Sequence, residues 1–373
     1  MNVNFITDKI NKALTAAGLK RGLASADAVR ATIDKAFAAV GLTRRQTAKA
    51  GAPSVHEGDD QIVLEREHER EHEHEHAHEP ESGRFLALTH RGPRGRRDYK
   101  LYVPSSYTDV AMPLVVMLHG CKQNPDDFAA GTQMNRLAEE RGFLVAYPAQ
   151  TALANGSNCW NWFERSQQSR EGAEPTILVG IVADITAAYA VQSDQVFVAG
   201  LSAGAAMAVI LGRTHPEVFA GVAAHSGLPL GAAHDVASAF AAMGGRPVAG
   251  AAHDDAPGGR NAPTPRTMVL HGSADTTVKA SNGAAIVAQA VASFEAGAGP
   301  LQQLTRQSGG RGATRARSAQ VAVWADESGV PLVEHWLVQD GAHAWFGGDS
   351  SGSYTDAAGP DASAEIVRFF MHP

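Results

Sequence analysis

A serine lies at the centre of the most informative stretch of the sequence. Val196-Phe197-Val198-Ala199 leads into Gly200-Leu201-Ser202-Ala203-Gly204, and the residues that follow, up to Leu211, have a helical composition. A short apolar run that stops at a glycine indicates a buried parallel strand. The glycines permit a sharp turn between strand and helix, and such a turn exposes the serine hydroxyl at the edge of a sheet. We therefore predict that Ser202 is a nucleophile; the alternative is an ordinary glycine-flanked serine at a strand end.

A serine hydroxyl needs a base, and the base needs a partner that orients it. The sequence contains 16 histidines, so position must select among them. In a doubly wound sheet, catalytic groups gather beyond the carboxyl ends of the strands. Asp275 follows the apolar run 267–270, and His343 follows the run 332–338. The chain order Ser202, Asp275, His343 is typical of hydrolases with this architecture, so we predict a Ser-His-Asp triad. Taken singly, Asp275 also suits a helix cap and His343 a locally bonded loop residue.

The chemistry of such a triad defines what else the sequence must supply. His343 would remove the Ser202 proton during attack on an ester carbonyl, and Asp275 would fix the tautomer of the imidazole. The oxyanion that forms needs backbone donors. We predict that these are the N–H of Ala203, at a helix N-terminus, and the N–H of Cys121, in the loop after Leu118-His119-Gly120. The alternative for that loop is structural: a tight turn at the glycine with the histidine packed beneath it.

Strands and helices that could position these residues alternate from residue 84 onwards. Strands are expected at 85–89 and 99–103, buried strands at 113–118, 143–147, 196–199, 221–225, 267–270 and 332–338, and helices at 126–142, 175–190, 205–211, 283–297 and 361–370. This alternation predicts an α/β fold with a mostly parallel, doubly wound sheet covered by helices on both faces. Residues 228–264 and 304–318 are rich in alanine, glycine, arginine and polar residues, which predicts surface insertions over the strand ends.

The first 83 residues differ in character from the rest. Residues 1–45 contain two short amphipathic patterns, which predict a helical N-terminal extension. Residues 46–83 form a His/Glu-rich linker whose alternating charges leave no apolar face to bury, and residues 84–373 form the catalytic domain. The linker is expected to be a solvated spacer; the alternative is loose binding of zinc, nickel or copper by its histidines. We predict no fixed metal site and no cofactor.

Composition excludes several classes of protein. The sequence is 44% hydrophobic and 19% charged, values that fit a globular enzyme. No apolar stretch approaches the ~20 residues of a transmembrane helix. The net charge is +6 over residues 1–49, −9 over residues 50–81 and −4 over the remainder, so the main body carries no nucleic-acid-binding footprint. Only two cysteines occur, which excludes a disulfide scaffold and a four-thiolate zinc site.

Four motifs together resemble the polyhydroxybutyrate depolymerase family of esterases, which are α/β-hydrolases related to feruloyl and acetylxylan esterases. They are Leu118-His119-Gly120-Cys121-Lys122-Gln123, Cys159-Trp160-Asn161-Trp162-Phe163, Gly200-Leu201-Ser202-Ala203-Gly204 and Gly341-Ala342-His343-Ala344-Trp345. The resemblance covers about residues 85–373 and implies an α/β-hydrolase fold and ester hydrolysis. It places Ser202 as nucleophile, His343 as base and Asp275 as acid. Phe346 departs from the small residue or proline expected there.

The resemblance leads us to expect a serine esterase acting on short-chain hydroxyalkanoate polyesters or oligomers. The nearest alternative is a carbohydrate esterase of feruloyl or acetylxylan type, and an alternative of another class is a non-catalytic surface-binding protein. The N-terminus has no positive cluster followed by an apolar core, which predicts a cytoplasmic protein. Export by a non-classical route is the alternative. The basic extension, residues 1–45, is a candidate for attachment to a polyester granule surface; the alternative is docking on the catalytic body or on another copy.

Aromatic and cysteine residues near the strand ends complete the predicted site. Trp345 follows His343 by two residues and is expected to line the cleft, as are Trp160 and Trp162; the alternative for each is packing in the interior. Cys121 and Cys159 lie in loops at the same edge of the sheet, where a disulfide would tie the two loops together. The alternative is a pair of free thiols, which the reducing conditions of a cytosol would favour.

Overall fold

The computed structural model of the protein describes residues 83–246, 263–309 and 317–371. The chain divides into two units, Met1–Glu81 and Ser82–Pro373, and all described residues belong to the second. The predicted helical extension at 1–45 and all of the predicted linker at 46–83 except Gly83 lie outside the described residues. Those predictions therefore stay predictions.

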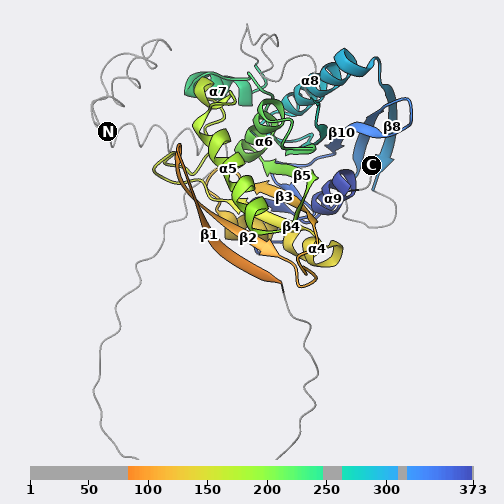
Figure 1. Ribbon diagram of the computed structural model, residues 1–373. Helices are drawn as coiled ribbons and strands as arrows, with labels where there is room; N and C mark the ends of the chain where they lie inside the picture. The colour runs from red at the N-terminus through yellow and green to blue at the C-terminus, as the bar shows by residue number, and fades with distance from the viewer. Residues whose placement is uncertain (1–82, 247–262, 310–316, 372–373) are drawn as a thin grey trace, which may run out of the picture. The chain divides into compact units, whose positions relative to one another are not determined.

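A ten-stranded mixed sheet forms the middle layer of the second unit (Figure 1). Its strand order is β1-β2-β4-β3-β5-β6-β7-β10-β9-β8. Its strands are β1 Arg84–Gly92, β2 Gly95–Val103, β3 Met112–Leu118, β4 Leu144–Pro148, β5 Val191–Leu201, β6 Gly221–His225, β7 Arg266–Gly272, β8 Gln302–Ser308, β9 Ala319–Ala325 and β10 Pro331–Val338. The central strands β4, β3, β5, β6, β7 and β10 run parallel, and antiparallel pairs flank them on both sides. A second sheet pairs β11 Trp345–Phe346 with β12 Thr355–Asp356.

Helices cover both faces of the sheet. They are α3 Pro125–Thr132, α4 Met134–Arg141, α5 Ala173–Ala188, α6 Ala203–Thr214, α7 Val236–Met243, α8 Ser281–Ala298 and α9 Ala362–Met371, with a 3₁₀ turn η1 at Arg165–Gln167. Helices α5, α6 and α8 pack on one face, and α3, α4 and α9 pack on the other. This is the predicted α/β architecture, in which parallel strands are buried on both faces.

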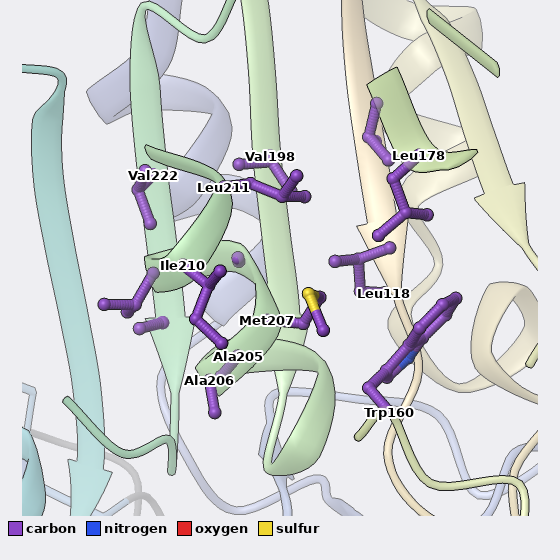
Figure 2. Close-up of a cluster of buried hydrophobic side chains, with 14 of the residues drawn as sticks. Leu118, Trp160, Leu178, Val198, Ala205, Ala206, Met207, Ile210, Leu211 and Val222 are labelled. Atoms are coloured by element: carbon purple, nitrogen blue, oxygen red, sulfur yellow. The ribbon is translucent and has the colours of Figure 1, made fainter. Parts of the chain in front are cut away.

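Successive side chains along each strand point to opposite faces of the sheet, so the protein has two hydrophobic cores, one on each face. In β5, Val198 belongs to the core under α6, while Phe197 and Ala199 belong to the core on the opposite face. Figure 2 shows the first core, where Met207 and Leu211 of α6 pack toward β5. Because β5 is buried on both faces and hydrogen-bonded to β3 on one side and β6 on the other, its carboxyl end at Ser202 is held in place.

The structure differs from the sequence-based expectation in several details, among them β9, which was not predicted as a strand. The single helix expected over 126–142 is divided into α3 and α4 at Gln133, which has a left-handed backbone with φ of 56°. Residues 304–308, expected to begin a surface insertion, belong to β8, which pairs with β9 in an antiparallel ladder. Side chains of β8 are exposed on both faces, so the strand has no hydrophobic period to mark it.

No helix in residues 83–246, 263–309 or 317–371 combines the length and apolar character required to cross a bilayer.

Loss of a core side chain should destabilise the protein far more than loss of the same side chain at the sheet edge. Leu114 in β3 is fully buried, whereas Leu304 in β8 is 66% exposed. We expect Leu114→Ala to lower the free energy of unfolding by about 3 kcal/mol and Leu304→Ala by less than about 0.5 kcal/mol. Denaturant unfolding followed by circular dichroism measures both. Equal losses would mean that β3 does not lie in the core.

Candidate active site

Ser202 lies on a strained turn between β5 and α6. Its backbone has φ of 57° and ψ of −116°, a conformation that residues with a side chain rarely adopt. Its N–H donates to the carbonyl of His225 at 2.9 Å, and its carbonyl accepts from the N–H of Ala206 at 3.0 Å. Backbone strain of this kind persists only where surrounding contacts enforce it, and it is concentrated at functional sites. The predicted strand-turn-helix around Ser202 is therefore confirmed.

The two glycines that flank Ser202 are required by close backbone contacts. A side-chain carbon at Gly204 would lie 2.0 Å from the carbonyl oxygen of Leu118, and one at Gly200 would lie 2.4 Å from the carbonyl carbon of Gly204. Atoms cannot approach so closely, so any larger residue would force α6 away from the ends of β3 and β5. The first turn of α6 is thus held directly against the loop that begins at His119.

Asp275 and His343 are brought together as predicted. The Nδ1 atom of His343 lies 2.7 Å from Oδ2 of Asp275. The other oxygen, Oδ1, accepts from the backbone N–H groups of Thr277 and Val278, both at 2.8 Å. Burial alone would raise the pKa of Asp275, but hydrogen bonds from His271 and His343 outweigh it and hold that pKa well below its usual range. Asp275 is therefore an ionised carboxylate facing an imidazole.

Sheet topology places Ser202 at the same edge as this pair. Strands β5, β6, β7 and β10 are consecutive neighbours and parallel, so their carboxyl ends meet at one edge. The loops that carry Asp275 and His343 touch through glycine, since a side-chain carbon at Gly272 would lie 2.2 Å from the carbonyl oxygen of Gly341. Because Nδ1 of His343 contacts Asp275, its Nε2 is the nitrogen left to exchange a proton with a serine hydroxyl.

The loop after β3 lies against Ser202. A side-chain carbon at Gly120 would lie 3.7 Å from Cβ of Ser202, and the Gly120 N–H donates to Oε1 of Gln123 at 2.9 Å. The Gly120 carbonyl lies 2.8 Å from Nδ1 of His119, while Nε2 of His119 accepts the N–H of Gln150 at 3.1 Å. Since Nε2 accepts, Nδ1 carries the proton and donates to the carbonyl. This bond fixes the peptide plane whose other end is the N–H of Cys121.

Burial keeps His119 neutral. Its side chain is 1% exposed, and burial lowers the pKa of His119 to about 4. A neutral imidazole can donate from one nitrogen and accept at the other, as both contacts of His119 require. His119 is therefore packed beneath the turn and supports the loop, as the structural alternative in the sequence analysis stated.

Cys121 and Cys159 form a disulfide. It joins the loop after β3 to the loop that precedes Trp160, and the Lys122 N–H donates to the Ser157 carbonyl at 2.8 Å beside it. The sequence left this pairing open, since proximity in loops at one edge permits a bond without requiring it.

The three tryptophans predicted to line the cleft lie in the interior instead. Trp160 is fully buried, and its indole N–H donates to the His119 carbonyl at 3.0 Å. Trp345 is 1% exposed and donates to Oγ of Ser363 at 3.0 Å. Trp162 is 6% exposed and packs edge-on to Phe163. Figure 2 shows Trp160 beside Leu118 at the end of β3. The packing alternative therefore replaces the predicted substrate contact for all three.

Two buried histidines beside the triad were missed by the sequence analysis. His225 ends β6; its carbonyl accepts the N–H of Ser202, and its ring stacks on Trp345 with centroids 5.0 Å apart. Burial lowers the pKa of His225 well below its usual value. His271, in β7, has its Nε2 2.8 Å from the Val278 carbonyl and 3.5 Å from Oδ2 of Asp275. Each of these histidines ends or nearly ends an apolar strand, and this position in the sequence could have indicated that it lies near the triad.

No group of three or more histidine, cysteine, aspartate or glutamate side chains is arranged to hold a metal ion within the described part of the chain.

Comparison with known families identifies the chain. The family described as "Esterase PHB depolymerase" matches residues 97–310, more than half of the sequence. The chain belongs to this family. The matched region contains Cys121, Ser202 and Asp275, and His343 lies beyond it. The fold is accordingly an α/β-hydrolase fold, as the four sequence motifs predicted.

The proteins that this chain resembles fall into two groups. The chain is 37% identical over 186 residues to "Poly(3-hydroxyalkanoate) depolymerase C" of Paucimonas lemoignei, covering 48% of this chain and 44% of the relative. It is 29% identical over 220 residues to "Probable acetylxylan esterase A" of Aspergillus fumigatus, covering 54% of this chain and 56% of the relative. The chain thus spans about half the length of the curated relatives it matches. Among solved structures, it is similar in fold to an acetyl xylan esterase from Aspergillus awamori, with a TM-score of 0.59, 20% identity and coverage of 77% of this chain and 99% of that chain.

Thiol titration tests the disulfide directly. The sequence has two cysteines, and both are bonded to each other. Unfolded in denaturant without reductant, the protein purified from an oxidising compartment should show no free thiol, and Cys121→Ser should show one. Loss of the bond should lower the free energy of unfolding by about 2–4 kcal/mol. Two reactive thiols in the unreduced protein would contradict the pairing.

Proposed function

We propose that this protein is a carboxylic ester hydrolase and that Ser202, His343 and Asp275 are its catalytic triad. The observation that carries the proposal is the 2.7 Å contact between His343 and a deeply buried Asp275, at the sheet edge where Ser202 sits on a strained turn. A serine on such a turn, with a histidine whose orientation is fixed by an aspartate, is the arrangement used for acyl transfer.

Acylation would begin with attack of the Ser202 hydroxyl oxygen on the ester carbonyl carbon. Nε2 of His343 takes the hydroxyl proton, and the ionised Asp275 stabilises the imidazolium that results. When the tetrahedral intermediate collapses, the C–O bond to the alcohol breaks and His343 returns the proton to the departing alcohol. An acyl group then remains on Ser202.

Deacylation repeats these steps with water. His343 removes a proton from the water as it attacks the acyl carbon, then returns it to Ser202 as the acid leaves. In both halves, the negative oxygen needs two donors. The N–H of Ala203, the first residue of α6, is one, since helix N-terminal amides have no partner within the helix. The N–H of Cys121, whose peptide plane is fixed by His119, is the other.

The proposed substrate is a short-chain hydroxyalkanoate polyester or its oligomers. Identity of 37% to a poly(3-hydroxyalkanoate) depolymerase supports this choice. A second candidate is an acetyl or feruloyl ester of a plant polysaccharide, supported by similarity to an acetylxylan esterase and by 31% identity over 128 residues to "Feruloyl esterase B" of Neurospora crassa. The two candidates share the chemistry at Ser202 and differ in the groups on either side of the ester.

Substitutions in the triad test the proposed mechanism. Ser202→Ala should lower kcat for p-nitrophenyl butyrate by at least roughly 10⁴-fold, and Asp275→Asn by roughly 10³- to 10⁴-fold because the imidazole loses its orienting charge. Ser328→Ala, at an exposed turn, is the matched control and should leave kcat unchanged. Undiminished turnover by Ser202→Ala would exclude Ser202 as nucleophile, and absence of turnover by the wild type on any ester would favour a non-catalytic binding protein.

A substrate panel separates the two candidate substrates. We expect kcat/KM for 3-hydroxybutyrate oligomers to exceed that for methyl ferulate and for acetylated xylan by at least roughly 10-fold. Release of acid is measured for all three at equal enzyme concentration, with Ser202→Ala as the blank. A preference for acetylated xylan or methyl ferulate would transfer the assignment to the carbohydrate esterases.

A further inference from the structure

A buried polar cluster lies beside the loop that carries Cys121, and the proposed mechanism makes no direct use of it. Its members are Arg97 of β2, Gln150 after β4, Asn161, and Glu174 in the first turn of α5, which are 4%, 5%, 8% and 3% exposed. Burial of a carboxylate and a guanidinium costs several kcal/mol unless both are well paired. A cluster of this kind therefore calls for a physical role.

The carboxylate of Glu174 is the centre of the cluster. Its Oε2 accepts the backbone N–H of Asn161 at 2.8 Å, and its Oε1 accepts the side-chain amides of Asn161 at 2.7 Å and Gln150 at 2.5 Å. Burial raises the pKa of Glu174, and these bonds and the charge of Arg97 oppose the rise. The carboxylate thus accepts three hydrogen bonds and satisfies donors from both Asn161 and Gln150.

Gln150 is held between two opposite charges. Its carbonyl oxygen accepts from Nη1 of Arg97, and its amide nitrogen donates to Glu174 and to the Cys159 carbonyl, the latter at 2.9 Å. An amide between a guanidinium and a carboxylate has a single favourable orientation, because the reverse would place donor against donor and acceptor against acceptor. The Gln150 backbone is fixed with it.

Three links connect this cluster to the loop that carries Cys121. The backbone N–H of Gln150 donates to Nε2 of His119 and thereby sets the tautomer that holds the Gly120 carbonyl. Trp160, next to Asn161, donates to the His119 carbonyl. Cys159, whose carbonyl is bonded by Gln150, is joined covalently to Cys121.

We propose that Glu174 is a positioning residue for the oxyanion donor. Its carboxylate fixes Gln150 and the segment 159–161, and these hold His119 and Cys121 so that the Cys121 N–H points toward the oxygen that becomes negative. This inference rests on the proposed esterase function and on the proposed role of Cys121. Glu174 touches no reacting atom, so its contribution is geometric.

Glu174→Gln tests the inference, because it keeps the shape of the side chain and replaces one acceptor oxygen with a donor. Turnover of p-nitrophenyl butyrate should fall roughly 10- to 100-fold in kcat, with KM within about two-fold, as expected for displacement of an oxyanion donor. The matched control is Glu217→Gln, an exposed glutamate paired with Arg170, which should behave as wild type.

Inhibitors separate positioning from general loss of structure. A butyl trifluoromethyl ketone forms a tetrahedral oxyanion adduct with the serine, whereas butyrate does not. In Glu174→Gln, Ki for the ketone should rise in proportion to the fall in kcat, while Ki for butyrate stays unchanged. A ketone Ki that stays at the wild-type value, or an equal rise for both inhibitors, would overturn the inference.

A second variant keeps the test valid if Glu174→Gln does not fold. Trp160→Phe removes the indole N–H bond to His119 and keeps an aromatic ring in the core. In this variant, kcat should fall less than in Glu174→Gln, and Ki for the ketone should rise while Ki for butyrate stays unchanged. A ketone Ki at the wild-type value, or an equal rise for both inhibitors, would count against the inference. Wild-type protein that neither hydrolyses the ester nor binds the ketone would instead refute the proposed function.

Discussion

The contact between the first turn of α6 and the end of β3 is the constraint on which the rest of the site depends. At Gly204 the two backbones are so close that a side-chain carbon would fall 2.0 Å from the Leu118 oxygen. The distance between Ser202 and the loop at 119–121 is therefore set by backbone against backbone, with no flexible side chain between them. Gly272 does the same for the other half of the site, where it meets the Gly341 carbonyl. Ser202 and the loop at 119–121 form one rigid pair, and the loops of Asp275 and His343 form another; adjacent parallel strands join the two pairs.

Burial keeps three other histidines of the protein neutral. His119 and His225 are held neutral by burial, so each serves as a fixed donor or acceptor. Burial likewise lowers the pKa of His335, on β10, to about 4. The carboxylate of Asp275 accepts hydrogen bonds from backbone N–H groups as well as from His343, and its pKa is held low enough that it stays ionised at neutral pH. In the proposed mechanism, His343 exchanges a proton with the Ser202 hydroxyl while Asp275 stays ionised.

The placement of Ser202, Asp275 and His343 at one edge of the sheet could be predicted from the sequence because each has a local signature. Ser202 lies between glycines at the end of an apolar strand, and Asp275 and His343 follow two other apolar strands, so parallel-sheet geometry alone brings them to one edge. The tryptophans were assigned wrongly because distance along the chain says nothing about direction. Trp345 is two residues from His343, but it begins β11 and turns inward onto Phe128 and His225. Similarly, the break at Gln133 leaves no mark in a helical pattern that continues on both sides of it.

The support for the site could not be predicted, because it is assembled from residues far apart in the sequence. Arg97 lies in β2, Gln150 in the loop after β4 and Glu174 in α5, and nothing in their neighbours indicates that they meet. Stability is a weak explanation for their cluster, since well-packed apolar residues in place of a buried charged network are often equally stable or more so. The backbone N–H of Gln150 sets the tautomer of His119, and Arg97 and Glu174, on either side of the Gln150 amide, hold that N–H in place. In the proposed role, His119 in turn holds the peptide whose N–H belongs to Cys121. Apolar side chains could not orient Gln150 in this way. Orientation therefore explains the presence of these charges better than stability does.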